Sequence, residues 1–97
     1  MNWGCRLKVK LTRLASRDLQ SARDYIHQDK PGAAQAVVAR VFKAIDQLIA
    51  FPMIGRAGRV PNTRELVVSG ASLFIVYQIK SGILFIVRVL HTAQQWP

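Results

Sequence analysis

The feature that most constrains this chain is a change in the spacing of its apolar residues across the segment Phe51–Ser69. Before this segment, apolar residues recur every three or four positions, as they do along one face of a helix. After it, they come in short runs rich in β-branched residues, which predict strands. Because 97 residues are the usual length of one domain, we expect a single domain over residues 1–97, in which this segment joins a helical half to a strand-rich half.

The N-terminal half predicts one strand followed by two helices. Residues 5–11 alternate between apolar and basic side chains, which is typical of a half-buried strand with a basic outer face. Thr12 is suited to cap a helix that carries apolar residues at helical spacing over residues 15–26. After a short break, residues 33–50 repeat that spacing until Pro52 ends the second helix. Two helices joined by so short a turn predict a helical hairpin.

The C-terminal half predicts three strands, over residues 64–69, 73–79 and 83–90. Ser81-Gly82 is a two-residue connection that predicts a tight hairpin between the last two strands. The fold class is therefore α+β: an N-terminal strand, a helical hairpin and a three-stranded antiparallel meander. The N-terminal strand is expected to pair elsewhere in that small antiparallel sheet, and the helices to pack on one of its faces. The other face, beside the C-terminal tail, is then the natural ligand surface.

The charge of the chain points to its partners. It has 14 lysines and arginines against 5 acids, for a net charge of +9. Such an excess favours association with a target that contains nucleic acid or with an acidic protein. The alternative is a solvated basic surface that keeps the protein in solution.

Several classes of site are disfavoured by the residues present. The single cysteine, Cys5, excludes an internal disulfide and fits a reducing compartment. His27 and His91 show no metal-ligand spacing, and G-R-A-G is not a phosphate-binding loop. The chain has no apolar run long enough to span a bilayer and no signal-peptide pattern near Met1. We expect a cytoplasmic protein with no membrane association, no metal and no cofactor.

A basic set stands out in the half that carries the sheet. Its members are Arg56, Arg59, Arg64, Arg88 and His91. Arginines bind phosphate or carboxylate groups at two points, and a histidine that titrates near neutrality transfers protons. Arg88 is predicted to point away from both of its strand neighbours. In the alternative interpretation, Arg64 and Glu65 are surface charges and Arg88 extends its stem along the strand to reach solvent.

The order of elements and several short motifs resemble the RelE/ParE family of bacterial type II toxins, from Leu7 to Pro97. The shared pieces are L-T-x-x-A-x-x-D-L at Leu11–Leu19, Tyr25-Ile26, F-P-x-x-G-R at Phe51–Arg56, R-E-L-V-V at Arg64–Val68, I-V-Y at Ile75–Tyr77, V-L-H at Val89–His91 and W-P at Trp96–Pro97. Each piece is short, and their order and spacing together carry the resemblance.

The resemblance implies one of two activities. RelE-like members cut messenger RNA in the ribosomal decoding site, using basic residues that include an arginine just before the I-V-Y-like strand. ParE-like members inhibit DNA gyrase and lack that set. This chain has Phe74 in place of that arginine, and Thr92 and Gln94 where arginines often follow the histidine. Only His91 is left as an acid–base candidate. A phenylalanine, in addition, cannot stabilise a developing phosphorane charge.

The resemblance therefore implies a ParE-like toxin that inhibits DNA gyrase by binding it. One alternative is a RelE-like ribosome-dependent ribonuclease that uses His91 with Arg59, Arg64 or Arg88. Another is a nontoxic binding module of the same fold. The residues expected to contact the target are Arg56, Arg59, Arg64, Arg88, His91 and Trp96.

The resemblance also implies a partner. Toxins of this family are held inactive in a hetero-oligomer by an acidic antitoxin, ParD-like or RelB-like, whose tail folds onto the toxin. The residues expected to contact it are Arg6, Lys8, Lys10, Arg13 and Arg17, which are the five positive charges of the first seventeen residues.

Overall fold

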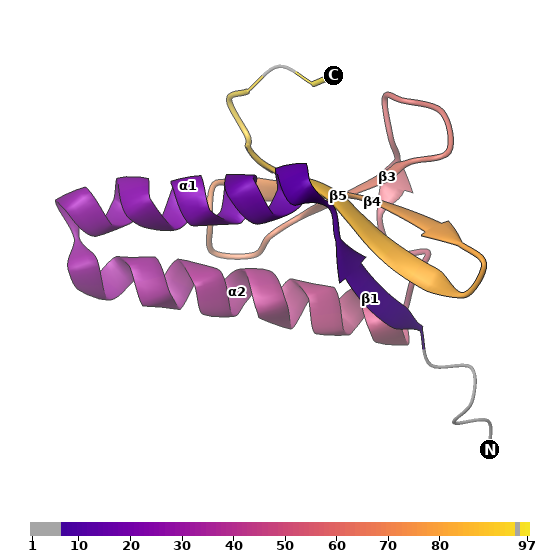
Figure 1. Ribbon diagram of the computed structural model, residues 1–97, viewed down its shortest axis with the longest axis horizontal. Coiled ribbons are helices and arrows are strands. Elements are labelled where there is room, and N and C mark those ends of the chain that lie inside the picture. Colours follow the sequence, from indigo (N-terminus) through magenta and orange to yellow (C-terminus); the bar gives the residue numbers. More distant parts are fainter. Residues whose placement is uncertain (1–6, 95) are drawn as a thin grey trace.

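The computed structural model describes residues 7–94 and 96–97, and it has a layer of two helices against one sheet (Figure 1). The elements are β1 (Lys8–Leu11), α1 (Arg13–Asp29), α2 (Pro31–Ala50), β2 (Arg56–Ala57), β3 (Arg64–Val67), β4 (Leu73–Lys80) and β5 (Ile83–His91). The strands form one sheet in the order β1-β5-β4-β3-β2. The predicted α+β class, with a helical hairpin on one face of the sheet, is confirmed. In Figure 1 the turn between the helices and the tip of the β4–β5 hairpin lie at opposite ends of the molecule.

Capping residues mark the start of α1 and the two ends of α2. The hydroxyl oxygen of Thr12 accepts a hydrogen bond from the Ala15 backbone N at 3.1 Å and donates one to the Val87 carbonyl at 2.7 Å. The cap therefore also ties the start of α1 to β5. Pro31 occupies the first turn of α2, where a missing N–H is harmless. Phe51 caps the other end of α2, directly before Pro52.

The sheet is mixed rather than fully antiparallel. β1 runs parallel to β5, whereas β5, β4, β3 and β2 pair antiparallel in turn. The β4–β5 turn has φ of 54° at Ser81 and 74° at Gly82, the left-handed pair that a type I′ turn requires. The predicted two-residue hairpin and the meander of β3, β4 and β5 are therefore confirmed.

Several predicted details are wrong or extend beyond the described residues. Cys5 and Arg6 lie outside the described residues, and the first strand starts at Lys8. The third strand ends at Val67 rather than at residue 69. β2 was not predicted, because two residues show no periodicity.

A β-bulge in β5 changes the facing of its side chains. Val76 pairs with Arg88, but the next residue, Tyr77, pairs with Ile86, which leaves Val87 as the extra residue. Val87 packs beside Phe74 on one face, and Val89 belongs to the core on the other. The prediction that both neighbours of Arg88 face the same way is therefore wrong.

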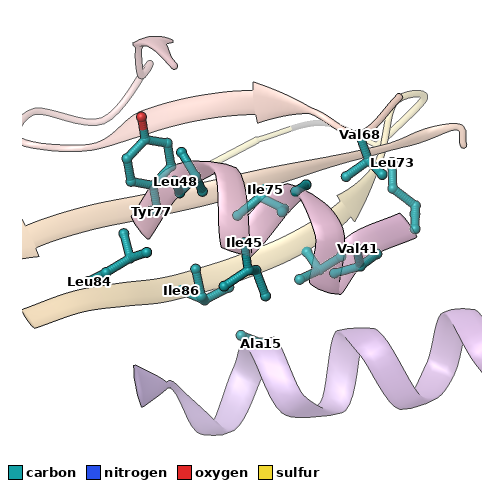
Figure 2. Close-up of a cluster of buried hydrophobic side chains, with 12 residues drawn as sticks. Ala15, Val41, Ile45, Leu48, Val68, Leu73, Ile75, Tyr77, Leu84 and Ile86 are labelled. Atoms are coloured by element: carbon teal, nitrogen blue, oxygen red, sulfur yellow. The ribbon is translucent and has the colours of Figure 1, made fainter. Parts of the chain in front are cut away.

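The main core lies between the helices and the sheet (Figure 2). Val41, Ile45 and Leu48 of α2 point toward the sheet residues, and Ala15 brings α1 close to them because it has no bulk beyond Cβ. The sheet side of this core is formed by Leu73, Ile75, Tyr77, Leu84, Ile86 and Val89. Burial of these side chains contributes roughly 1.5–3 kcal/mol each for the larger ones.

A smaller apolar cluster lies on the opposite face of the sheet, which we call the open face. Phe74, Val76 and Leu90 are buried there, with Val87 and Trp96 packed against them. Trp96 belongs to the C-terminal tail, so the tail covers this end of the open face. The end near the β4–β5 turn has no such cluster among the described residues.

Candidate functional site

Glu65 lies at the centre of the arginines on the open face. Its side chain is 1% exposed and accepts a hydrogen bond from Arg56 Nη2 at 3.0 Å and one from the Arg59 backbone N at 3.1 Å. Arg59 Nε lies 3.8 Å from the same carboxylate. The interpretation of Glu65 as a surface charge is therefore wrong. A buried carboxylate with these partners fixes the loop after β2 against the sheet, because losing them would leave a buried charge unpaired.

Arg59 connects three parts of the open face. Its Nη1 donates to the Trp96 carbonyl oxygen at 3.2 Å. Its guanidinium carbon lies 5.7 Å from the centre of the Phe74 ring, within the range of a cation–π contact. Phe74 is 4% exposed. The phenylalanine is thus a buried core residue of this face, with an arginine above it that also holds the tail.

Arg88 is held at two points by α1. Its Nε and Nη2 donate to Asp18 Oδ2 and Oδ1 at 2.6 Å and 2.9 Å, and the Val89 backbone N donates to Oδ2 at 3.1 Å. The hydrogen bonds to Asp18 raise the pKa of Arg88 above its ordinary value. The guanidinium carbon also lies 6.0 Å from the centre of the Trp96 ring. Arg88 therefore joins α1, the last strand and the tail.

Asp18 is a structural residue that the sequence analysis did not assign. It accepts the Val89 N–H where β1 no longer covers the edge of β5, since β1 pairs only as far as Ile86. One signal was available: Asp18 lies between Ala15 and Leu19, beside the apolar face of its helix. An acid in that position requires a nearby donor.

Arg64 faces the helices, away from the open face. It is paired with Tyr77, whose side chain belongs to the main core. Arg64 Nη1 donates to the carbonyl oxygens of Gly55 at 2.8 Å and Met53 at 3.4 Å. Its guanidinium therefore binds the loop after α2.

Tyr77 holds the same loop from the core. Its hydroxyl donates to the Pro52 carbonyl at 2.8 Å and accepts from the Gly55 backbone N at 2.9 Å. Burial raises the pKa of Tyr77, and the hydrogen bond from Gly55 opposes that effect in part. A Cβ at position 55 would lie 2.5 Å from the tyrosine oxygen, so this close approach requires glycine.

His91 lies at the far end of the helix-facing side. It is paired with Leu73, four residues along β4 from the partner of Arg64, a separation of roughly 13 Å. Its exposed imidazole accepts from the Ala93 backbone N through Nδ1 at 3.2 Å. It borders a groove of about 550 Å³ lined by Asp18, Ser21, Ala22, Tyr25, Leu73, Val89, His91 and Gln94.

The structure divides the predicted target-binding residues into two groups. Arg56, Arg59, Arg88 and Trp96 lie together around the open face. Arg64 and His91 lie on the helix-facing side, at separate places. The single constellation expected from the sequence is therefore not formed. Whether either group contacts a target stays a prediction.

The residues predicted to bind an acidic partner occupy two surfaces. Lys8 and Lys10 have exposed side chains on the open face, because Val9 between them packs into the main core. Arg13 and Arg17 are exposed on the first two turns of α1. The fifth residue, Arg6, lies outside the described residues.

Two features are missing from the described part of the chain. Among the residues whose side chains the structure describes, no group of three or more histidine, cysteine, aspartate or glutamate side chains is placed to hold a metal ion. In the same residues, neither helix combines the length and apolar character needed to cross a bilayer.

Solved structures share this fold. The chain aligns with a structure described as the chromosomal ParDE toxin–antitoxin system from P. aeruginosa at a TM-score of 0.81 and 23% identity, covering 90% of this chain and 97% of that one. It also aligns with the toxin–antitoxin complex RelBE2 from Mycobacterium tuberculosis at a TM-score of 0.57 and 25% identity, covering 89% and 98% of the two chains.

Sequence relatives point the same way. The protein named "Putative toxin Y4kP" from Sinorhizobium fredii is 41% identical over 92 residues, which cover 95% of each chain. Toxin RelE2 from Caulobacter vibrioides is 39% identical over 87 residues, covering 90% of this chain and 97% of that protein. Residues 9–96 match the profile of the family described as the ParE toxin of the type II toxin–antitoxin system parDE. The chain therefore belongs to the ParE family of type II toxin–antitoxin toxins, as its resemblance to RelE and ParE proteins predicted.

Proposed function

We propose that this chain binds DNA gyrase and inhibits it without carrying out a reaction, and that a cognate acidic antitoxin neutralises it in a hetero-oligomer. The observation that carries the proposal is the burial of Phe74. It stands where the resemblance implies an arginine in RNA-cutting relatives, and it is buried under Arg59 in the apolar cluster of the open face. An apolar ring in that place supports binding rather than catalysis.

The neighbouring arginines support the same conclusion. Metal-independent RNA cleavage needs a cation at the developing charge and a proton-transfer group within reach of the same atoms. In the described residues, Arg56 and Arg59 bind Glu65, and Arg88 binds Asp18. His91 lies on the side of the sheet opposite the first two. These cations are positioned to hold the fold and to present exposed edges to a partner.

The helical hairpin offers a surface for the antitoxin. A groove of about 280 Å³ between the helices is lined by Leu11, Ser16, Leu19, Gln20, Arg23, Val38 and Phe42. Phe42 of α2 is 47% exposed at its border, and Arg13 and Arg17 carry positive charge along α1. An amphipathic acidic helix matches this combination of apolar groove and basic rim.

The test compares two targets with one purified chain. The chain should inhibit supercoiling by DNA gyrase and leave messenger RNA on translating ribosomes intact. The variant His91→Ala should still inhibit gyrase, because no proton transfer is needed. Cleaved transcripts that disappear in His91→Ala would instead establish a ribonuclease, and inactivity in both assays would establish a nontoxic binding module.

A further inference from the structure

Three lysines form a pattern on the open face near the β4–β5 turn. Strand pairing places Lys8 of β1 beside Ile83, which is paired in turn with Lys80 of β4. In the next row of the same face, Lys10 lies beside Phe85. All three lysine side chains are exposed. They come from both sides of β5 and lie around the end of the open face near the β4–β5 turn.

The spacing of these lysines follows from sheet geometry. Neighbouring strands are about 4.8 Å apart, so the backbones of Lys8 and Lys80 lie about 10 Å apart across β5. Lys8 and Lys10 lie about 7 Å apart along β1. Flexible lysine stems extend these positions by several ångströms, so the three charges span several successive phosphates of a nucleic-acid backbone.

The positive charge of the three lysines is not balanced by acids at this end of the open face, as far as the described residues show. The two acids that reach the described arginines of the open face are already bound, Glu65 to Arg56 and Arg59 and Asp18 to Arg88. No acid is paired with Lys8, Lys10 or Lys80 in the described residues. The positive potential here is therefore uncompensated, which favours a polyanion.

The distribution of apolar side chains favours nucleic acid over a protein. Protein interfaces depend on exposed apolar and aromatic anchors. The large exposed apolar residues of the described chain are Leu14, Tyr25, Phe42, Phe51, Met53, Ile54, Val67 and Ile79, and none belongs to the rows that carry the three lysines. Phosphate contacts need no such anchors.

The aromatic residues favour a duplex over a single strand. Single strands are bound by stacking their bases on exposed aromatic rings. On the open face, Phe74 is buried beneath Arg59, Arg88 lies over Trp96, and Phe85 is half-buried. We infer that Lys8, Lys10 and Lys80 bind the phosphate backbone of duplex DNA without reading its sequence.

The inference goes beyond inhibition of gyrase and is testable without that enzyme. It predicts that the toxin contacts DNA directly, and that an antitoxin seated on Lys8 and Lys10 competes with the duplex. Binding of the full chain to a labelled duplex of about 20 bp would be measured by fluorescence anisotropy between about 50 and 200 mM salt. Because no gyrase is present, the result is independent of whether the chain inhibits gyrase.

The decisive variant replaces Lys8, Lys10 and Lys80 with glutamine. Each lost phosphate contact should reduce the slope of log K against log salt by about one, so the triple variant should lose about three and bind at least about tenfold more weakly at 0.1 M salt. A matched control replaces Arg23, Lys30 and Lys43, which are exposed on the helical layer, with glutamine. It removes the same charge and should change the slope by less than about one.

Four results would overturn the inference. They are no salt-dependent duplex binding by the parent chain, equal losses in the two triple variants, tighter binding of single-stranded RNA than of duplex through the same lysines, and equally tight binding of polyglutamate through them. Thermal unfolding of both variants checks that the fold is retained.

Discussion

Asp18 and Arg88 are 70 residues apart in the sequence and form a two-point ion pair, at 2.6 Å and 2.9 Å, between the first helix and the last strand. The same carboxylate accepts the Val89 N–H, so it also completes the hydrogen bonding of β5 beyond the end of β1. One acidic residue thus connects the helical layer to the edge of the sheet.

Replacement of this acid should destabilise the fold. Asp18→Asn is expected to lower the free energy of unfolding by about 1–3 kcal/mol, because the amide cannot accept both Arg88 bonds. A double-mutant cycle with Arg88→Gln should give a coupling of about 1–3 kcal/mol in urea unfolding. Asp24→Asn, at an exposed site of the same helix, should change stability by less than about 0.5 kcal/mol. A coupling near zero would contradict the structural role of the pair.

Glu65 should matter more than the arginines that bind it. Glu65→Gln is expected to destabilise the fold by about 1–3 kcal/mol, because a buried amide N–H₂ would face two guanidinium groups. Arg56→Gln should lower stability by less than about 1 kcal/mol, since its side chain is 64% exposed and Arg59 still binds the carboxylate. Urea unfolding of the two variants measures the difference. Equal losses of stability in the two variants would show that Glu65 contributes no more than Arg56 to holding the loop after β2 on the sheet.

Stability should decrease in alkaline solution because of Tyr77. Burial raises its pKa in the folded chain above the ordinary value of 10.0. Between these two values the unfolded chain releases the phenolic proton and the folded chain keeps it, so the contribution is complete below pH 10 and is lost as pH rises through the folded pKa.

Tyrosine variants isolate this effect. Tyr77→Phe should remove the alkaline decrease and lower stability at pH 7 by about 1–2 kcal/mol through its lost hydrogen bonds. Tyr25→Phe is the control, because Tyr25 is 77% exposed. Urea unfolding from pH 8 to about pH 11 provides the measurement. An identical pH dependence in both variants would assign the decrease to other groups.

Two glycines should respond oppositely to alanine. Gly55→Ala is expected to destabilise the fold by about 1–3 kcal/mol, because the added Cβ would lie 2.5 Å from the Tyr77 oxygen. Gly32→Ala, in the first turn of α2, meets nothing within 4 Å and should stabilise by up to about 1 kcal/mol. Thermal unfolding of each variant tests the pair, and a neutral Gly55→Ala would show that the loop has room to shift.

Arg56 is the more exposed of the two arginines bound to Glu65, and its loss should weaken the proposed interaction with gyrase. Arg56→Gln is expected to raise the concentration needed for half-inhibition of supercoiling by about three- to tenfold, since a charge at the border of an interface mainly affects association. Lys43→Gln, on the outer side of α2, should leave that concentration unchanged. Inhibition unaffected by Arg56→Gln would place the gyrase contact elsewhere on the chain.

The periodicity of the sequence predicted the arrangement of helices and strands well. Alternation from residue 7 onward, the helical spacing around Ala15 and Val41, and the Ser81-Gly82 turn are local signals, and the structure confirms the elements they predicted. The parallel pairing of β1 with β5 has no such signal, because it depends on contacts between residues about 75 positions apart.

The candidate site was less predictable because its geometry depends on which face of the sheet the helices cover. Arg64 and Glu65 are consecutive in a strand and must point to opposite faces. The sequence pattern does not indicate that Glu65 is the one of the two that lies buried on the open face. The bulge at Val87 is also invisible in the apolar pattern, and it moves the side chains that follow. The sequence therefore identified the basic residues but did not show which lie on the open face and which on the helix-facing side.

The position of β5 between β4 and β1 has a consequence for synthesis of the protein. β1 leaves the translating ribosome before its hydrogen-bonding partner, Ile83–Ile86, which is made about 75 residues later. Until then, Leu7, Val9 and Leu11 lack the neighbouring strand that aligns them over the core. The complete sheet therefore assembles only after β5 has been translated, which leaves the nascent chain without its full sheet until that point.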